Sequence, residues 1–527
     1  MSTPDLSRKK SLFKKVGVIS FITTISRVLG LIREIVRATF LGTSFYNDAF
    51  TLAFSLPNLF RRLTAEGVMI NAFIPVFCKV QKEEGEQSAL NYASSFFWMA
   101  TLVLVIFSML FIAFSPWLVQ YIFAPGFKEE SLSLTIFLTR FMFLYIVFIS
   151  LAAIGQGVLN SFSQFWVSAV TPVLLNISII GFAIWLSPRL PNPTFGFAMG
   201  VIIGGLIQLG FHYPFLRKKG FRLFTGVDFR NPHLAETFKL IIPTIFGVGI
   251  YQINIIVSNL IATTVGEGAI SSLNFSNRLL ELFLGIFVIS IVTVILPKFS
   301  NLFLEKQFDQ ITIDLRFALR MTTFISLPII VGTYLLSEDI VSLLYKRGLF
   351  DQKSVLLTAG ALKYHIIGLV FISWNRLLVT SYQAARYLRR MVQISFVVMI
   401  VNIIIALWLS MEMKHLGIAL ANSISQATQT VLLLYFIHEF GVGKIISLKM
   451  IKQILKILFC CIIMAGGVYY CKSFFNTWNK LPLMITLPLN VSIGILCFII
   501  PAYILKCSEL MELILIFTKR KKQDRTV

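Results

Sequence analysis

The stretch FWMATLVLVIFSMLFIAF at residues 97–114 contains no charged side chain. A helix that crosses the hydrocarbon core of a bilayer needs about 20 mainly apolar residues, so this stretch predicts a membrane-spanning helix. Similar stretches recur along the 527 residues. Hydrophobic residues make up 57% of the chain and charged residues 13%, and the mean hydropathy is +0.81. Because a water-soluble fold cannot bury so much apolar surface, the sequence predicts an all-α polytopic membrane protein. It excludes a cytosolic enzyme, a secreted domain and a disordered protein.

Fourteen membrane-spanning helices are expected from these apolar stretches. Clusters of Lys and Arg at 8–10, 217–219, 386–390 and 519–522 all fall on one side when the N-terminus is placed in the cytoplasm. Since basic residues favour the cytoplasmic side, we expect both termini there. The net charge of +23 is interpreted as this topology signal together with contacts to anionic membrane lipids, and not as nucleic-acid binding. The spans begin near Val16, Phe45, Leu90, Leu132, Phe165, Thr194, Phe238, Ile270, Ile311, Val355, Val392, Gly417, Ile454 and Leu483.

Landmark residues recur at one offset along the chain. Gly126 and Gly348 lie 222 residues apart, in similar surrounding sequence, and Pro75 and Pro297 lie 222 residues apart. The offset predicts two six-helix lobes in a parallel pseudo-twofold repeat, with a cavity between the lobes and two further C-terminal helices. Two more pairs, Gly196 with Gly417 and Gln208 with Gln429, are offset by 221. The expected parts are a basic N-terminus (1–15), an N-lobe (16–222), a C-lobe (223–440), the last two helices (441–507) and a basic tail (508–527).

Neither a metal nor a cofactor is expected. The six cysteines form no CxxC pair, and the five histidines lack metal-ligand spacing. The sequence GVGK at 441–444 lacks the spacing of a phosphate-binding loop. These absences disfavour a membrane enzyme, which would need catalytic groups in sizeable loops.

Several predicted spans carry charged residues that are costly in a bilayer. A Lys or Arg at the bilayer centre costs roughly 2.5–3.5 kcal/mol on insertion scales. One interpretation is that these residues form structural ion pairs. The other is a cationic cavity for an anionic substrate, because basic residues exceed acidic ones and Arg suits bidentate recognition of phosphate. The residues are Arg27, Arg33, Glu34 and Arg37 in the first span; Asp48, Arg61, Arg62 and Glu66 in the second; and Asn274, Arg278 and Glu281 in the eighth. Lys239, Arg316, Arg320 and Lys456 are expected to extend from helix ends to the membrane surface.

Two motifs near the N-terminus stand in a specific order, SRVLGLIRE at 26–34 and NDAFTLAFSLPNLFRRLTAEG at 47–67. They are followed by AFIPVF at 72–77, APGF at 124–127, PVLLNISIIGFA at 172–183 and NRLLELFLGIFVISIVTVILP at 277–297. Together they resemble the MurJ (MviN) family, the lipid II flippases of bacterial peptidoglycan synthesis, within the superfamily of multidrug and oligosaccharide-lipid exporters.

The resemblance implies a fold, a substrate and a set of site residues. It implies two six-helix lobes, with helices 13 and 14 forming a groove for the lipid tail. It also implies transport of a polyprenyl pyrophosphate disaccharide-pentapeptide across the bacterial inner membrane by alternating access, with cell-wall synthesis machinery as a possible partner. The residues that match essential family arginines are Arg27, Arg33, Arg61 and Arg278, and Asp48 matches a family acid. Glu34, Asp48 and Glu281 are expected to hold the arginine side chains.

This chain departs from the family pattern in three places. The Arg-Asp pair of the family's first helix is Arg33-Glu34 here, which is a mild change. The arginine of helix 8 is preceded by Asn277 where the family often has Asp, and helix 11 offers Asn402 and no carboxylate for sodium. The missing carboxylate on helix 11 argues against sodium coupling and makes the membrane potential the simpler energy source. The energy source itself is not fixed by the sequence.

Other functions stay open at this point. A drug exporter of the same superfamily should have an acidic cavity, whereas these spans are basic. A flippase for another polyprenyl-linked oligosaccharide, such as an O-antigen precursor, would show the same charge pattern, and only the family motifs favour lipid II. A membrane scaffold without transport activity would have no need of buried arginines.

Overall fold

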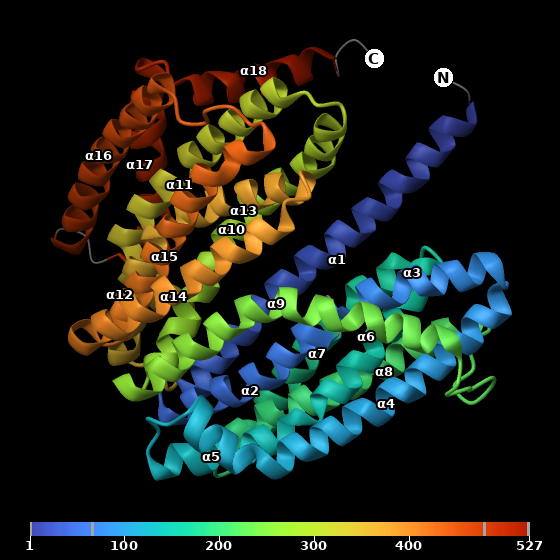
Figure 1. Cartoon of the computed structure of the whole chain (residues 1–527). Coiled ribbons are helices and arrows are strands. Elements are labelled where there is room, and N and C mark those ends of the chain that lie inside the picture. The colour runs from blue at the N-terminus through green and yellow to red at the C-terminus, as the bar shows by residue number, and fades with distance from the viewer. Residues whose placement is uncertain (1–2, 65–67, 478–480, 524–527) are drawn as a thin grey trace. The chain divides into compact units, whose positions relative to one another are not determined.

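The computed structural model describes residues 3–64, 68–477 and 481–523, and in this part of the chain all regular structure is helical (Figure 1). The chain divides into two compact units. Unit 1 contains Met1–Ser271 and Arg347–Asp351, and unit 2 contains Ser272–Lys346 and Gln352–Val527. The all-helical prediction is confirmed.

Unit 1 is a bundle of long helices. The α1 helix packs against α7, α2 against α5, and both α6 and α7 against α8, while α9 packs against α2, α3 and α4. Leu41, Phe50, Tyr145 and Phe197 belong to one buried cluster in this bundle. The elements are α1 (Thr3–Leu41), α2 (Phe45–Thr64), α3 (Val68–Glu83), α4 (Glu86–Trp117), the π-helix η1 (Leu118–Phe123), α5 (Glu129–Phe143), α6 (Tyr145–Ser161), α7 (Phe165–Leu186), the 3-10 turn η2 (Ser187–Arg189), α8 (Thr194–Lys218) and α9 (Pro232–Val265).

Unit 2 holds most of α10 and the later helices. The α11 helix contacts α12, α13, α16 and α17, and α15 contacts α12, α13 and α14. The α16 and α17 helices pack against each other. The elements are α10 (Ala269–Leu304), α11 (Phe308–Tyr345), α12 (Gln352–Ile367), α13 (Leu369–Ala384), α14 (Leu388–Met413), α15 (His415–Phe436), the 3-10 turn η3 (Ile437–Phe440), α16 (Leu448–Thr477), α17 (Leu483–Ile504) and α18 (Ser508–Gln523).

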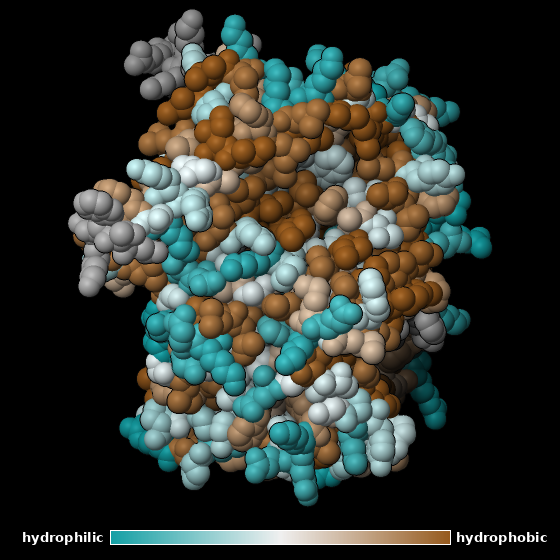
Figure 2. Space-filling model, turned by 90° about the vertical axis from the view of Figure 1, so that its left-hand side faces the viewer, coloured by the Kyte–Doolittle hydropathy of each residue, from teal (hydrophilic) through white to brown (hydrophobic). Residues whose placement is uncertain are grey.

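Membrane-spanning character is evident in length, composition and surface. Eight helices of the described part are long and apolar enough to cross a membrane, and a ninth is obtained when α12 and α13, bent by 46°, count as one span. Large apolar side chains such as Met411 (84% exposed) lie on the surface, and Figure 2 shows broad hydrophobic areas on one face. The protein is therefore a multi-pass membrane protein. Each of the fourteen predicted spans begins on a helix, but the helices that carry five of them, α1, α2, α9, α10 and α15, are not among those that meet these criteria in the described residues, so the count of fourteen stays a prediction.

The order of elements is similar in the two predicted lobes. Each predicted lobe has a span that is interrupted at one residue, Leu144 between α5 and α6 and Gly368 between α12 and α13, although only the second pair is bent by more than 40°. In addition α6 contacts α8 as α13 contacts α15, and α7 contacts α8 as α14 contacts α15. These features favour the internal repeat; superposition of the lobes stays a prediction.

The α9 helix clusters with unit 1, although the sequence places it at the beginning of the predicted C-lobe. The α9 helix packs against α2, α3 and α4, and polar contacts near its beginning belong to this packing. Lys79 Nζ pairs with Glu236 at 3.1 Å, and the buried Tyr92 hydroxyl lies 2.5 Å from Thr237 Oγ1. The predicted lobe boundary after residue 222 and the compact boundary after Ser271 are therefore different divisions of the chain.

Candidate functional site

Three charged side chains form a cluster on α1. Glu34 Oε1 accepts a hydrogen bond from Arg33 Nη2 at 2.8 Å, and Glu34 Oε2 lies 2.8 Å from Arg37 Nη2. Glu34 and Arg37 are buried, whereas the Arg33 side chain keeps 20% of its surface exposed. One carboxylate thus contacts two guanidinium groups, so these three residues together carry one net positive charge.

Asn176 holds the cluster from a neighbouring helix. Its Oδ1 accepts a hydrogen bond from Arg33 Nη1 at 3.1 Å, and its Nδ2 donates to the carbonyl oxygen of Ser26 at 3.2 Å. Asn176 lies on α7, which packs against α1. The Arg33 guanidinium is therefore fixed by two side chains before any ligand binds. Sequence reasoning missed this role of Asn176, although the residue lies in the PVLLNISIIGFA motif.

The other predicted residues of unit 1 have different surroundings. Arg27 is exposed on α1, and Arg61 Nε donates to Asn58 Oδ1 at 3.1 Å near the end of α2. Arg62 is partly buried beside it. Glu66 lies outside the described residues.

The predicted residues of unit 2 lie in the second turn of α10 and beyond. Arg278 Nη1 pairs with Glu281 Oε2 at 2.9 Å, one turn further along the helix. Both side chains are partly exposed, and Asn274 is exposed one turn earlier. The expected pairing of Glu281 with an arginine is therefore confirmed. Whether Arg278 joins the arginines of unit 1 in one cavity stays a prediction.

Asp48 has a different role from the one expected. It was predicted to hold an arginine, but its two carboxylate oxygens accept backbone hydrogen bonds from Gly268 N at 2.6 Å and Ser271 N at 2.8 Å. These amides belong to the turn at the beginning of α10, where backbone N–H groups have no partner within the helix and favour a negative charge. Asp48 thus connects α2 to that turn.

Three of the basic residues that are expected to reach the membrane surface make specific contacts within the protein. Arg316 donates to the carbonyl oxygens of Lys444 and Ile445, and Lys456 Nζ donates to Leu505 O at 3.1 Å. Arg320 lies 3.3 Å from the buried carboxylate of Glu509. Because these contacts connect helices to sequence-distant segments, substitution of these residues is expected to affect stability.

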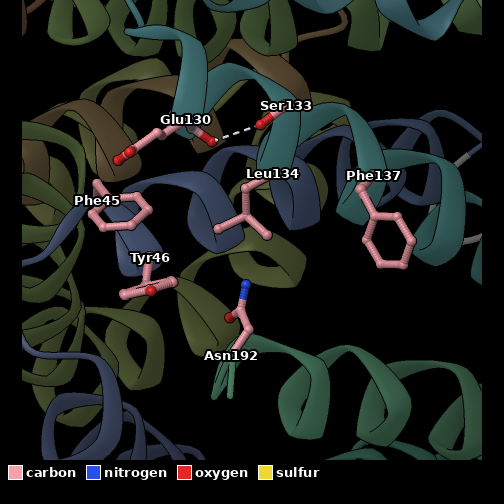
Figure 3. A pocket seen from close by; sticks show the side chains of 7 residues that line it. All are labelled: Phe45, Tyr46, Glu130, Ser133, Leu134, Phe137 and Asn192. Atoms are coloured by element: carbon pink, nitrogen blue, oxygen red, sulfur yellow. Dashed lines mark hydrogen bonds between the residues drawn. The ribbon is translucent and has the colours of Figure 1, made fainter. Parts of the chain in front are cut away.

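An open pocket of about 440 Å³ lies in unit 1 (Figure 3). Phe45 and Tyr46 of α2 lie on one side and Phe137 of α5 on the other, with Glu130 near Phe45 and Asn192 pointing towards Leu134. None of the predicted arginines lines this pocket. Among the described residues, no group of three or more His, Cys, Asp or Glu side chains could hold a metal ion.

The α1 cluster has the chemistry of an anion site. A guanidinium presents N–H donors in a planar fork that matches the oxygens of phosphate. Arg33 is partly exposed and held in one orientation, which lowers the cost of ordering it when a ligand binds. A transport protein that binds an anionic substrate is thus the class that this helical fold and this cluster favour.

Comparisons with known proteins identify the class and then the family. The family described as "Lipid II flippase MurJ" matches residues 37–489. A probable lipid II flippase MurJ from Treponema pallidum is 34% identical over 443 residues, covering 82% of this chain and 83% of that protein. Lipid II flippase MurJ from Burkholderia cenocepacia is 29% identical over 472 residues, covering 88% and 91%.

Solved structures agree with this assignment. A structure of lipid II flippase MurJ in an inward closed conformation has a TM-score of 0.77 and 28% identity, covering 92% of this chain and 98% of that one. An inward-facing multidrug resistance MATE family transporter of the MOP superfamily has a TM-score of 0.68 at 14% identity, which shows the fold alone. The fold is therefore similar to that of this transporter. This chain belongs to the lipid II flippase MurJ family.

Proposed function

We propose that this protein moves lipid II, a polyprenyl pyrophosphate carrying a disaccharide-pentapeptide, from the cytoplasmic to the outer leaflet of the bacterial inner membrane. Family membership supports the substrate, because the relatives that this chain matches over most of their length are named as lipid II flippases. The observation that carries the proposal in this chain is the α1 cluster, in which the carboxylate of Glu34 contacts both Arg33 and Arg37.

Arg33 has the central role in this proposal. The pyrophosphate of the substrate is anionic, and its transfer out of water is unfavourable unless fixed positive groups replace its hydration. Arg33 is partly exposed and is oriented by Glu34 and Asn176, so it can form charge-assisted hydrogen bonds to phosphate oxygens without first being ordered. Arg37 is buried beside it and adds positive charge to the same part of α1.

Arg27, Arg61 and Arg278 complete the proposed site. In a two-lobed transporter, the substrate site lies at the interface of the lobes, and alternating access opens it to each side in turn. We infer that the four arginines meet the pyrophosphate in a cavity that is open to the cytoplasm, and that rocking of the lobes removes these contacts and releases the lipid outside. Substrate binding would favour closure because it offsets repulsion between the arginines.

The proposal also covers topology, binding of the lipid tail, partners and the energy source. Both termini lie in the cytoplasm, fourteen spans are arranged as two six-helix lobes, and α16 and α17, the predicted helices 13 and 14, hold the lipid tail. Anionic lipids contact the basic cytoplasmic segments, and the cell-wall synthesis machinery is a candidate partner. The membrane potential is the proposed driving force, at about 2.3 kcal/mol per charge per 100 mV.

Complementation tests the proposal. The gene is expressed in a bacterium depleted of its own lipid II flippase, and surface exposure of lipid II is measured alongside growth. We expect rescue by the wild-type chain and by Lys239→Ala, in which an exposed residue is changed, and no rescue by Arg33→Ala at equal expression. Failure of the well-expressed wild-type chain would favour another polyprenyl-linked oligosaccharide as the substrate.

A further inference from the structure

The five-residue segment Arg347–Asp351 is separated from its neighbours in the chain. It clusters with unit 1, although α11 before it and α12 after it belong to unit 2. Leu349 N donates a hydrogen bond to the carbonyl oxygen of Thr39, near the end of α1, at 2.9 Å. The connection between α11 and α12 is thereby fastened to the end of α1.

This contact is made by backbone atoms at two glycines. A Cβ atom added to Gly348 would overlap the carbonyl oxygen of Thr39, and one added to Gly42 would overlap the carbonyl oxygen of Leu349. Both glycines also have φ of +55°, a conformation that other residues adopt at a cost. The Leu349 side chain is 60% exposed, so it contributes little to the contact. Only glycine at positions 42 and 348 allows these two segments of the chain to approach each other this closely.

A second contact of the same kind occurs at the repeat-related position. Gly126 lies against the backbone of Thr263 and Thr264 near the end of α9, where an added Cβ would come within 2.6 Å of backbone atoms. Gly126 and Gly348 are the pair offset by 222 residues, and α1 and α9 are the first helices of the two predicted lobes. Each predicted lobe thus places a loop on the end of the other lobe's first helix. On the predicted topology, both contacts lie at the outer ends of the helices.

We propose that Arg347–Asp351 is a clasp that holds the outer end of the transporter closed, and that it must leave Thr39 and Gly42 before the outer side can open. The close approach at the two glycines is made by backbone atoms, whereas the Phe350 side chain of the same segment is buried, so release of the clasp also has to move that side chain. The contact of Gly126, in the predicted N-lobe, with Thr263 and Thr264 of α9 has the same role. This inference rests on the alternating access of the proposed function.

Variants of two residues test the clasp. Gly348→Ala introduces overlap with Thr39, and Leu349→Pro removes the N–H that donates to Thr39. Hydrogen exchange of residues 346–351 is measured in nanodiscs. Outer-side labelling of an Ala38→Cys reporter, buried on α1 beside Thr39, is measured in cells by peptide mass spectrometry, which leaves the native cysteines in place. Both substitutions weaken the contact with Thr39. Each is expected to raise the hydrogen exchange of residues 346–351 and the labelling of the Ala38→Cys reporter about tenfold.

Two matched variants serve as controls. Gly181→Ala adds a methyl group where nothing lies within 4 Å, and Leu349→Ala keeps the backbone N–H. Both should behave as the wild type. Wild-type labelling in folded Gly348→Ala and Leu349→Pro, even with faster exchange, would overturn the proposal, as would failure of both variants to fold. Neither readout measures the transport of a lipid-linked substrate, so a wrong substrate would leave the result on the clasp unaffected.

Discussion

Replacement of Glu34 by Gln should convert the α1 cluster from a stabilising arrangement into a destabilising one. In the wild type, the carboxylate of Glu34 lies 2.8 Å from both Arg33 Nη2 and Arg37 Nη2. Glutamine has nearly the same shape but no charge, so the variant leaves two guanidinium groups close together. Arg37 is buried, so the substitution removes a negative charge that contacts a buried guanidinium.

The magnitude follows from the burial of the pair. Opposite charges about 4 Å apart attract by about 4 kcal/mol at an effective dielectric constant near 20. Removal of one partner from a buried pair typically costs about 3–5 kcal/mol, because the other charge is left uncompensated. We therefore expect Glu34→Gln to lower the free energy of unfolding by about 3 kcal/mol and to reduce flipping strongly.

A double-mutant cycle separates the ion pair from other effects of the substitution. The free energy of unfolding is measured by SDS titration in mixed micelles for the wild type, Glu34→Gln, Arg37→Gln and the double variant. The double variant should recover part of the stability, with a coupling energy of at least about 1.5 kcal/mol. Additive costs, or a Glu34→Gln variant as stable and active as the wild type, would refute the view that Glu34 neutralises Arg37.

Further changes have separate expected outcomes. Arg33→Lys should restore part of the lipid II exposure that Arg33→Ala abolishes, because lysine keeps the charge and loses the planar fork; equal activity of the two variants would contradict phosphate recognition. Asp48→Asn should reduce the free energy of unfolding by about 1.5–3 kcal/mol in the same titration, because the neutral side chain accepts less well from Gly268 and Ser271. Reporter fusions should place Val527 in the cytoplasm and Gly126 outside, and a periplasmic C-terminus would contradict the fourteen-span count.

Local sequence determined the helical membrane class and the charged residues of α1. The thickness of the bilayer sets the length of the apolar stretch that crosses it, so each apolar span can be identified from its own stretch of sequence. Arg33 and Glu34 stand out for the same reason, since charge within an apolar span is costly and therefore conspicuous. Their contact joins adjacent residues, and that of Glu34 with Arg37 spans a single turn, so both follow from helical geometry.

Only the tertiary structure decided which distant groups complete these local features. Asn176 reaches Arg33 across 143 residues, and the carboxylate of Asp48 meets backbone amides rather than an arginine. Periodicity identifies the face on which a side chain lies but not the helix that covers that face. A backbone amide at a helix end also has no signature in the side-chain pattern. The assignment of α9 and Arg347–Asp351 to unit 1 has the same cause, because packing between sequence-distant segments determines it.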